Sequence, residues 1–347
     1  MSSRPRRLLA VMFVALSALT AGCGALGDES EAAAASGPPV LRIGLPTSVT
    51  SFANADILVA KEKGFLADYG VSAEIQNFRS GVSVVQAVAD GQIDIGASSI
   101  EPVVNAAASG ADIVIIGSPS DRLAVSAVTP KDVVSPADLR GRPLGVQEVG
   151  AFREVMTRLV LQQAGMTPND VQYVPVEAQS YTAALVDGRI QSAILQTEQA
   201  VAAAHAYQNL YVLVNLADIV PNYHYSTFFV SRSWLEANRE TAERLITGIT
   251  KAHRYMYNNK QETVRIVADA TGYDDSIISE AYDILLTQRQ IFPLNTGLDP
   301  DRIRSTVDTM RQLGILEGEA PPVDRLVDTG PATDAIKQLG EISGARR

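Results

Sequence analysis

Cysteine is almost absent from this chain of 347 residues, which contains only Cys23. A disulfide within the chain is therefore impossible. Long hydrophobic runs are also scarce: after one N-terminal apolar stretch, none reaches the roughly 20 residues that a bilayer-spanning helix needs. These absences predict a water-soluble body, and the length predicts one large or two medium domains.

The motifs of several enzyme classes are missing too. The sequence has no phosphate-binding loop with its lysine, no Gly-x-Gly-x-x-Gly segment opening a predicted helix, and no Gly-x-Ser-x-Gly turn. His205, His224 and His253 are far apart and lack the spacing of metal ligands. We therefore expect a protein that is not an enzyme and that uses no cofactor and no metal.

Basic charge is in deficit, because the formal net charge is −10. The first 22 residues carry three arginines and no acid, so a chain without them would have a charge of about −13. This balance argues against a nucleic-acid partner, which requires a basic surface. It does not exclude an anionic ligand, since the potential inside a pocket is local.

The N-terminus has the composition of an export signal. Arginines at positions 4, 6 and 7 precede an apolar run from Leu8 to about Leu19, and small residues follow up to Cys23. This order predicts a signal peptide over residues 1–22. The Arg6-Arg7 pair leaves the general secretory route and the twin-arginine route both open.

The segment Leu19-Thr20-Ala21-Gly22-Cys23 resembles the lipobox of bacterial lipoproteins, with Thr20 in place of the usual Leu, Val or Ile. The resemblance implies a lipid on Cys23 that anchors the protein to the outer face of the cell membrane, in the cell envelope. The alternative is a free buried cysteine beside an uncleaved anchor. Residues 23–39 are small, polar and without periodicity, which predicts a flexible tether.

From Val40 onward, short apolar strands alternate with amphipathic helices. The predicted strands are 40–44, 71–75, one that begins at 93–95, 112–117, 143–146, 171–176, 192–195, 210–216 and 226–230. The predicted helices are 52–63, 81–90, 99–109, 152–164 and 181–186, and the chain is helix-rich beyond residue 231. This alternation predicts an α/β fold with mostly parallel sheets flanked by helices.

Two segments echo each other. Residues 87–93 and 184–190 both pass from a helix end through Asp-Gly to the start of a strand. The echo indicates two lobes built alike, although Asp-Gly is also a common turn sequence.

Four segments together resemble a known family. They are Ala60-Lys-Glu-Lys-Gly-Phe-Leu with Tyr69-Gly-Val, then Val88-Ala-Asp-Gly-Gln-Ile-Asp-Ile-Gly, then Asp138-Leu-Arg-Gly-Arg-Pro-Leu-Gly-Val, and finally 184–198, in which Gln191 replaces the usual Asp. In this order they are similar to the type II periplasmic binding proteins, specifically the group for nitrate, sulfonate and taurine and its relatives for thiamine-pyrimidine precursors.

The resemblance implies a two-lobed α/β fold. Lobe 1 would comprise residues 40–126 and 226–340, lobe 2 would comprise 127–225, and 341–347 would be a tail. The two crossings, near Ala127 and Ser226, would form a hinge. A ligand would lie in the cleft, and the closed form would engage an ABC permease with its ATPase subunit. Receptors of this kind imply a monomer.

Candidate ligand-binding residues follow from two physical rules. Ligands of open α/β sheets lie at the carboxyl ends of strands, and helix N-termini there favour anions. The candidates are Thr50, Phe52, Arg79, Ser80, Ser98, Ser99 and Ser118 in lobe 1, Glu148, Gly150, Phe152, Gln196 and Glu198 in lobe 2, and Tyr223 and Tyr225 near the second crossing.

Several candidates have a second interpretation. Arg79 is either the contact for a ligand anion or a solvated loop charge. Ser80 and Ser99 contact ligand or only cap helices, while Phe52 and Phe152 stack on a ligand ring or pack in the core.

The tyrosines on either side of His224 contact the ligand or only the hinge. Glu198 would repel a pure anion, and in the cleft it favours a zwitterion or an amino-bearing heterocycle. The sequence thus predicts an extracytoplasmic receptor that delivers a small sulfonate-, nitrate- or taurine-like anion to an ABC importer. A thiamine-pyrimidine-like or other aromatic ligand is the first alternative, and a sensory or adhesion lipoprotein without a permease is another.

Overall fold

The protein is described from a computed structural model that covers residues 39–46 and 51–344. The predicted signal peptide, Cys23, nearly all of the predicted tether and the candidate Thr50 lie outside the described residues. The described residues all belong to one compact unit. None of their helices is both long and apolar enough to cross a membrane.

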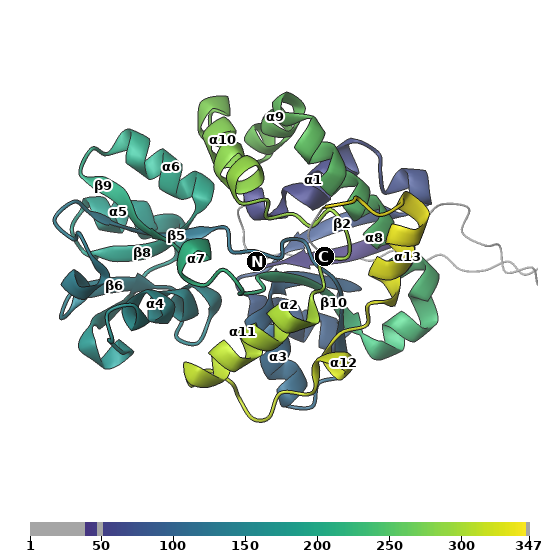
Figure 1. Ribbon diagram of the computed structural model, residues 1–347, viewed down its shortest axis with the longest axis horizontal. Coiled ribbons are helices and arrows are strands. Elements are labelled where there is room, and N and C mark those ends of the chain that lie inside the picture. Colours follow the sequence, from purple (N-terminus) through teal and green to yellow (C-terminus); the bar gives the residue numbers. More distant parts are fainter. Residues whose placement is uncertain (1–38, 47–50, 345–347) are drawn as a thin grey trace, which may run out of the picture. The chain divides into compact units, whose positions relative to one another are not determined.

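A first sheet combines strands from two distant parts of the chain. It contains β1 (Val40–Leu45), β2 (Ser72–Asn77), β3 (Ile95–Ser99), β4 (Ile113–Gly117) and β10 (Ser226–Ser231). Their order is β2-β1-β3-β10-β4. Figure 1 labels β2 and β10 of this sheet. Strand β1 is parallel to β2 and β3, whereas β10 is antiparallel to β3 and β4.

A second sheet repeats this arrangement and is built from the strands that lie between β4 and β10 in the sequence. It contains β5 (Val125–Pro130), β6 (Pro143–Val146), β7 (Gln172–Pro175), β8 (Ser192–Gln196) and β9 (Leu210–Asn215). Their order is β7-β6-β8-β5-β9, with β6 parallel to both neighbours and β5 antiparallel to β8 and β9. The chain therefore has the predicted two-lobed α/β fold, with two mixed sheets built alike.

One strand of each sheet runs against the others, and the crossings explain why. The strand that arrives from the other sheet begins where its neighbours end: Ser226 pairs with Ser99, and Val125 pairs with Gln196. Each arriving strand must then run back along the sheet. Both crossings thus lie at the edge where the parallel strands end.

The first crossing lies earlier than we predicted. Ala127 is buried within β5 and pairs with Ile194 and Val214, so the connecting segment is 118–124. Strand β5 itself was not predicted, because its sequence Val-Ser-Ala-Val-Thr-Pro is short and ends in a turn residue.

Helices flank both sheets. They are α1 (Ala55–Glu62), α2 (Gly81–Ala89), α3 (Ile100–Ala108), α4 (Phe152–Gln162), α5 (Tyr181–Val186), α6 (Thr197–Ala206), α7 (Leu216–Ile219), α8 (Arg232–Asn258), α9 (Lys260–Thr271), α10 (Asp275–Tyr282), α11 (Pro300–Gln312), α12 (Val323–Leu326) and α13 (Gly330–Leu339). A short 3-10 turn, Phe52–Asn54, precedes α1, and a π-helical segment, Asp283–Gln288, follows α10.

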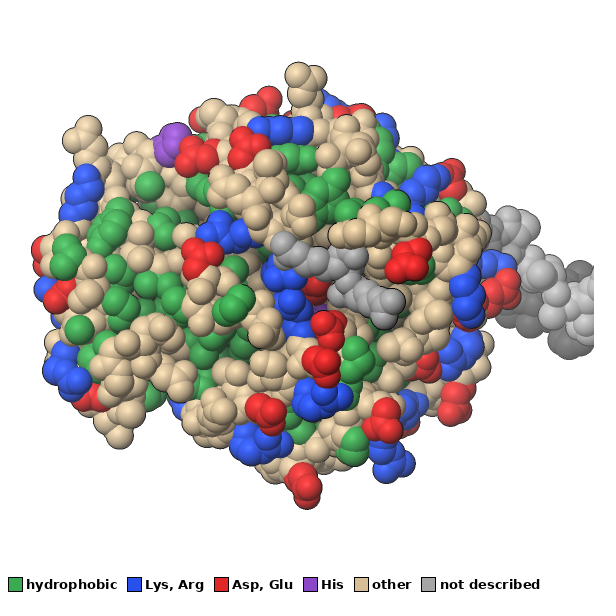
Figure 2. All heavy atoms as spheres, in the orientation of Figure 1, with side chains coloured by type: hydrophobic (Ala, Val, Ile, Leu, Met, Phe, Trp, Pro, Cys, Tyr) green, Lys and Arg blue, Asp and Glu red, His purple; other side chains and the backbone are tan. Residues whose placement is uncertain are grey.

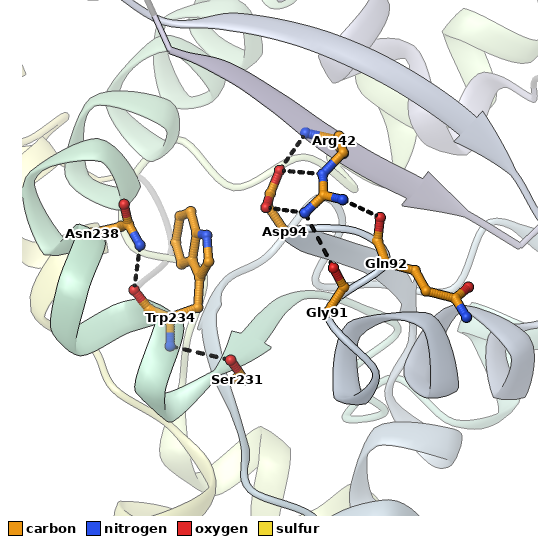
Figure 3. Close-up of polar contacts among 7 residues, drawn as sticks. All are labelled: Arg42, Gly91, Gln92, Asp94, Ser231, Trp234 and Asn238. Atoms are coloured by element: carbon orange, nitrogen blue, oxygen red, sulfur yellow. Dashed lines mark hydrogen bonds and ion pairs between the residues drawn. The ribbon is translucent and has the colours of Figure 1, made fainter. Parts of the chain in front are cut away.

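An acidic residue of the family-like pattern has a structural task. Arg42 of β1 binds Asp94, with Nη2 2.7 Å from Oδ1 and Nε 3.1 Å from Oδ2, and its Nη1 donates to the carbonyl of Gln92 (Figure 3). Burial acts to raise the pKa of Asp94, but the bonds from Arg42 hold it below its ordinary value. The ionised pair fixes the turn that leads into the first residue of β3.

Candidate functional site

Two cavities meet where strands of both sheets end. The first, which we call the Arg153 cavity, has a volume of about 320 Å³. Its lining residues follow the ends of β1, β2, β6, β7 and β8, and include Pro46, Asn77, Gln147, Glu177 and Gln196. The predicted location, at the carboxyl ends of the strands, therefore contains a cavity that both lobes line.

The second, the Val149 cavity, has a volume of about 360 Å³ and lies between α2, α3 and the loop before α4. A narrow space of about 80 Å³, the neck, shares lining residues with both cavities. It shares Arg79, Arg153 and Gln196 with the Arg153 cavity, and Ser99, Glu148 and Phe152 with the Val149 cavity. The three spaces are therefore neighbours along one cleft.

A larger groove of about 820 Å³ lies between α11 and the segment before α13. Arg232, which lines it, follows the last residue of β10, so the groove is at the opposite end of that strand from the cleft. Two of its arginines, Arg304 and Arg311, are exposed and paired with aspartates of their own helix. Charge there is already balanced, so we place the candidate site in the cleft.

Four helices begin at the cleft. The cleft is lined by the first residues of α2 and α4, the second residue of α6 and the residue before α3, and each of these helices has nine or more residues. The first N–H groups of a helix have no carbonyl partner within it, and the positive end of the helix dipole is at the same place. The convergence of these ends favours an anionic or carbonyl-bearing ligand.

Arg153, the second residue of α4, is the deepest cation of the cleft. Its side chain is buried, its guanidinium lies 5.3 Å from the centre of the Tyr181 ring, and its Nη1 donates to the carbonyl of Ile194. Within residues 39–46 and 51–344, no carboxylate lies within 4.0 Å of this guanidinium. Burial lowers the pKa of Arg153, yet a guanidinium stays charged in proteins. A buried cation without an ion-pair partner suits an anionic ligand.

Glu198 is the second buried charge of the Arg153 cavity. Its Oε1 accepts the backbone N–H of Phe52 at 3.3 Å, which joins the two lobes. Burial raises the pKa of Glu198 to about 7, while the N–H groups of Glu198 and Phe52 and the charge of Arg153 act to lower it. The Glu198 carboxyl group therefore titrates near neutral pH, and the cavity gains a negative charge as the pH rises through about 7.

Two rings border the neck. Phe152 and Tyr225 stack with their centres 4.9 Å apart and their planes at 28°. The Gln196 Nε2 donates to the Tyr225 hydroxyl at 3.4 Å, and the Gln196 Oε1 is buried without a hydrogen-bond partner among the described residues. The neck thus offers a flat apolar surface beside an unused acceptor.

The loop before α4 is held in place by the buried carboxylate of Glu154. Gly150 donates its N–H to Glu154 at 3.0 Å, and the buried Glu154 carboxylate also accepts from Arg158 and Tyr173, each at 2.7 Å. Gly150 has a φ of +82°, which favours glycine. These bonds fix the loop whose residues Gln147, Glu148 and Ala151 line the neck.

The structure brings nine of the candidates to the cleft: Arg79, Ser80, Ser99, Glu148, Gly150, Phe152, Gln196, Glu198 and Tyr225. The Arg79 side chain is 68% exposed and lies 3.8 Å from Glu177 of the other lobe. Ser80 accepts the N–H of Ser83 and so caps α2, whereas the hydroxyl of Ser99 makes no cap bond to α3.

Four other candidates are engaged elsewhere. The Phe52 ring packs in the core, 6.4 Å from Tyr282. The hydroxyls of Ser98 and Ser118 donate to the carbonyls of Ser99 and Ser226, each at 3.0 Å, and Tyr223 donates to the buried Glu101 at 2.6 Å. The bond from Ser118 to Ser226 joins the two segments that connect the lobes.

Sequence reasoning missed Arg153. The available signal was its helical spacing: Arg153, Thr157 and Val160 lie on one face of α4, and all three are buried. An arginine on the apolar face of an amphipathic helix, in its first turn, indicates a buried cation that is a candidate contact for an anion.

Residues 51–263 match the family model described as NMT1/THI5 like. The chain belongs to this family. The predicted resemblance is thereby confirmed for more than half of the chain.

Individual members and structures agree with this assignment. A putative binding protein of Brucella abortus is 28% identical over 213 residues, which are 60% of this chain and 65% of the relative, so the match spans less than two thirds of that relative. The alkanesulfonate-binding protein SsuA of Xanthomonas axonopodis pv. citri, bound to MOPS, has a TM-score of 0.70 at 19% identity, covering 85% of this chain and all of that one. The nitrate-binding protein NrtA of Synechocystis PCC 6803 has a TM-score of 0.73 at 15% identity, covering 87% and 89%.

Proposed function

We propose that this NMT1/THI5-like protein is an extracytoplasmic receptor that captures a small anion in the interlobe cleft and delivers it to an ABC importer. One observation carries the proposal: Arg153 is a buried guanidinium, without an ion-pair partner among the described residues, at the N-terminus of α4. A sulfonate, nitrate or carboxylate would supply the missing charge. Two structurally similar proteins, named as alkanesulfonate-binding and nitrate-binding, support the same ligand class.

The position of Glu198 refines the ligand class. Arg153 and Glu198 line the same cavity, and the pKa of Glu198 is near 7. A simple anion is bound best when Glu198 is protonated, whereas a taurine-like zwitterion can use its ionised form for the ammonium group.

A second ligand class has its own support. The stacked pair Phe152 and Tyr225 offers a ring face at the neck, and Gln196 has an unused amide oxygen beside it. An aromatic heterocycle with an exocyclic amine, such as a thiamine-pyrimidine precursor, would use both.

The lobes already touch across the cleft. Phe52 donates to Glu198, and the Gln147 side chain donates to the carbonyl of Arg79 at 3.3 Å. Turning a mostly open population into a mostly closed one requires about 5 kcal/mol of differential affinity, and a micromolar ligand supplies about 8 kcal/mol. Ligand binding is therefore sufficient to drive closure, and the closed face would be what a permease recognises.

Location and partners follow from the same proposal. A receptor of this kind acts outside the cytoplasm, and the lipid on Cys23 would hold it at the membrane beside its permease. Figure 2 shows basic and acidic side chains interspersed over the face in view, without a gathered basic patch. This distribution supports a small-molecule ligand rather than a nucleic acid.

Calorimetry of the purified protein tests the ligand class. We expect methanesulfonate, taurine or nitrate to bind with at least micromolar affinity, because an anion pairs with Arg153. The same titration with an aminopyrimidine tests the second class. Binding of neither class would refute the receptor proposal, and turnover of a bound compound would replace it with an enzyme.

A further inference from the structure

One arginine of lobe 2 donates a hydrogen bond to the backbone of lobe 1. Arg158 lies in α4, and its Nη1 donates to the carbonyl of Leu313 at 3.0 Å. Leu313 caps the C-terminus of α11, so its carbonyl lies at the negative end of that helix, which attracts a cation. The Arg158 side chain is only 19% exposed, so water competes little for the bond. The contact is therefore a charge-assisted hydrogen bond between the lobes.

The chain just after Leu313 is fixed to lobe 1. Asn105 of α3, the helix that follows β3, donates from Nδ2 to the carbonyl of Ile315 at 3.0 Å. Its Oδ1 accepts the N–H of Glu317, also at 3.0 Å. These two bonds hold the end of α11 against α3. A rotation of the lobes about the two crossings would therefore lengthen the bond from Arg158.

The same guanidinium also holds a loop of lobe 2 that borders the cleft. Its Nε donates to Oε1 of the buried Glu154 at 2.7 Å, and Oε2 of this carboxylate accepts the N–H of Gly150 at 3.0 Å. The loop that contains Gly150 carries Gln147 and Glu148 to the neck. Glu154 directly follows Arg153 in α4. One side chain thus connects lobe 1 to the loop and to the helix end that carries the proposed anion contact.

We infer that Arg158 is a latch between the lobes, which stabilises their closed arrangement through Leu313 and positions the cleft loop through Glu154. The inference rests on the proposed receptor function and adds to it a residue away from the ligand. Arg158 lines neither of the two cavities nor the neck, so it is a positioning residue. Its loss should weaken anion binding although the contacts made by the ligand itself stay intact.

Arg158→Lys tests the latch in the full chain. Lysine keeps a cation beside the buried Glu154, but its side chain is shorter and ends in one donor group, so it cannot also bind Leu313. We expect the Kd for methanesulfonate, measured by calorimetry, to rise about tenfold, which corresponds to one hydrogen bond from a charged group.

Arg254→Lys is the matched control. Arg254 donates to the carbonyl of Leu339, the last residue of α13, at 3.1 Å, and to the carbonyls of Leu294 and Gly340, all within lobe 1. The same substitution therefore removes bonds of the same kind that do not join the lobes. Its urea midpoint should fall at least as far as that of Arg158→Lys, while its Kd for methanesulfonate should equal the wild-type value.

The separation of the lobes gives a readout that needs no ligand. With Cys23→Ser as background, spin labels on Gln162→Cys and Arg311→Cys report the distance between α4 and α11. Both positions are exposed. We expect a longer mean distance after Arg158→Lys than in the otherwise wild-type chain, and no change after Arg254→Lys.

The outcomes separate the latch from the receptor function. If Arg158→Lys binds methanesulfonate as tightly as the wild type, or loses affinity with unchanged distances, the latch is overturned and the receptor function stands. An equal loss of affinity in Arg254→Lys has the same meaning. If the wild type binds no sulfonate, the anion-receptor proposal fails, and the distances alone test the latch: equal distances with and without Arg158→Lys overturn it.

Discussion

Replacing Arg153 by methionine is expected to weaken the binding of a small anion by about thirtyfold or more. Removing one partner of a buried, hydrogen-bonded charge pair costs about 2–5 kcal/mol, and every 1.4 kcal/mol is about tenfold in Kd. Isothermal calorimetry with methanesulfonate measures the loss. Methionine fits because it keeps most of the volume of the side chain.

The ligand-free protein should respond in the opposite way. Arg153 is buried without an ion-pair partner among residues 39–46 and 51–344, and an apolar side chain at this position would not carry the desolvation cost of a buried charge. The urea midpoint of Arg153→Met should therefore equal or exceed that of the wild type. A purely structural arginine would show the reverse, with a lower midpoint and an unchanged Kd for the anion.

Arg79→Met is the matched control. Arg79 also lines the cleft, but its side chain is 68% exposed and already lies beside Glu177. Exposed ion pairs contribute about 0–1 kcal/mol, so we expect less than a tenfold loss of affinity. A larger loss for Arg79→Met than for Arg153→Met would make Arg79 the main anion contact, which is one of the two interpretations that the sequence leaves open.

The fold was largely predictable because its signals are local. Helix ends at Gly64, Gly91 and Gly165 have positive φ values, and such ends can be recognised without knowledge of tertiary contacts. Strand β5 was missed because its register depends on pairing with β8 and β9, which are 60 or more residues away in the chain. The sequence could not show that the arriving strand would start at the cleft edge.

The sequence predicts which residues lie at the cleft only where the order of strands and helices determines their position. Ser80, Ser99 and Gln196 follow strands, and strand ends meet at one edge, so their position at the cleft followed from the strand pattern. Phe52 follows a strand too, yet its ring packs against Tyr282 and Phe292, residues more than 200 positions later. Whether a ring faces a ligand or the core depends on such distant partners.

The burial of the two charged side chains in the Arg153 cavity could not be predicted from the sequence either. Burial of Arg153 and Glu198 runs against the composition rule that charged residues are exposed. Its place after β8 makes Glu198 a candidate from sequence alone, but its raised pKa arises from burial between lobes whose contact only the folded chain creates.

Replacing Glu198 by glutamine is expected to stabilise the ligand-free protein at alkaline pH. Its pKa is about 7 in the folded protein and near 4.5 in an unfolded chain, because burial disfavours the ionised form. Between these values the folded state holds a proton that the unfolded state has released, so wild-type stability falls as pH rises. The fall is complete above about pH 8 and amounts to at most about 3 kcal/mol.

Urea denaturation between about pH 5 and pH 8.5 checks this expectation. Below about pH 5, Glu198 is protonated in the folded protein, and wild type and Glu198→Gln should have similar stability. Above pH 7 the glutamine variant should become more stable than the wild type by up to about 3 kcal/mol. Glu148→Gln, a change of an exposed carboxylate in the same cleft, should leave the wild-type pH profile unchanged.

The affinity for the ligand should change over the same pH range in which Glu198 titrates. As pH rises through about 7, Glu198 ionises beside Arg153, so the affinity for methanesulfonate should fall in the wild type and stay constant in Glu198→Gln. A taurine-like zwitterion should lose less, because its ammonium group pairs with the ionised carboxylate. Parallel pH profiles for the wild type and Glu198→Gln, in both stability and binding, would contradict a role for Glu198 in ligand selection and leave that role to Arg153.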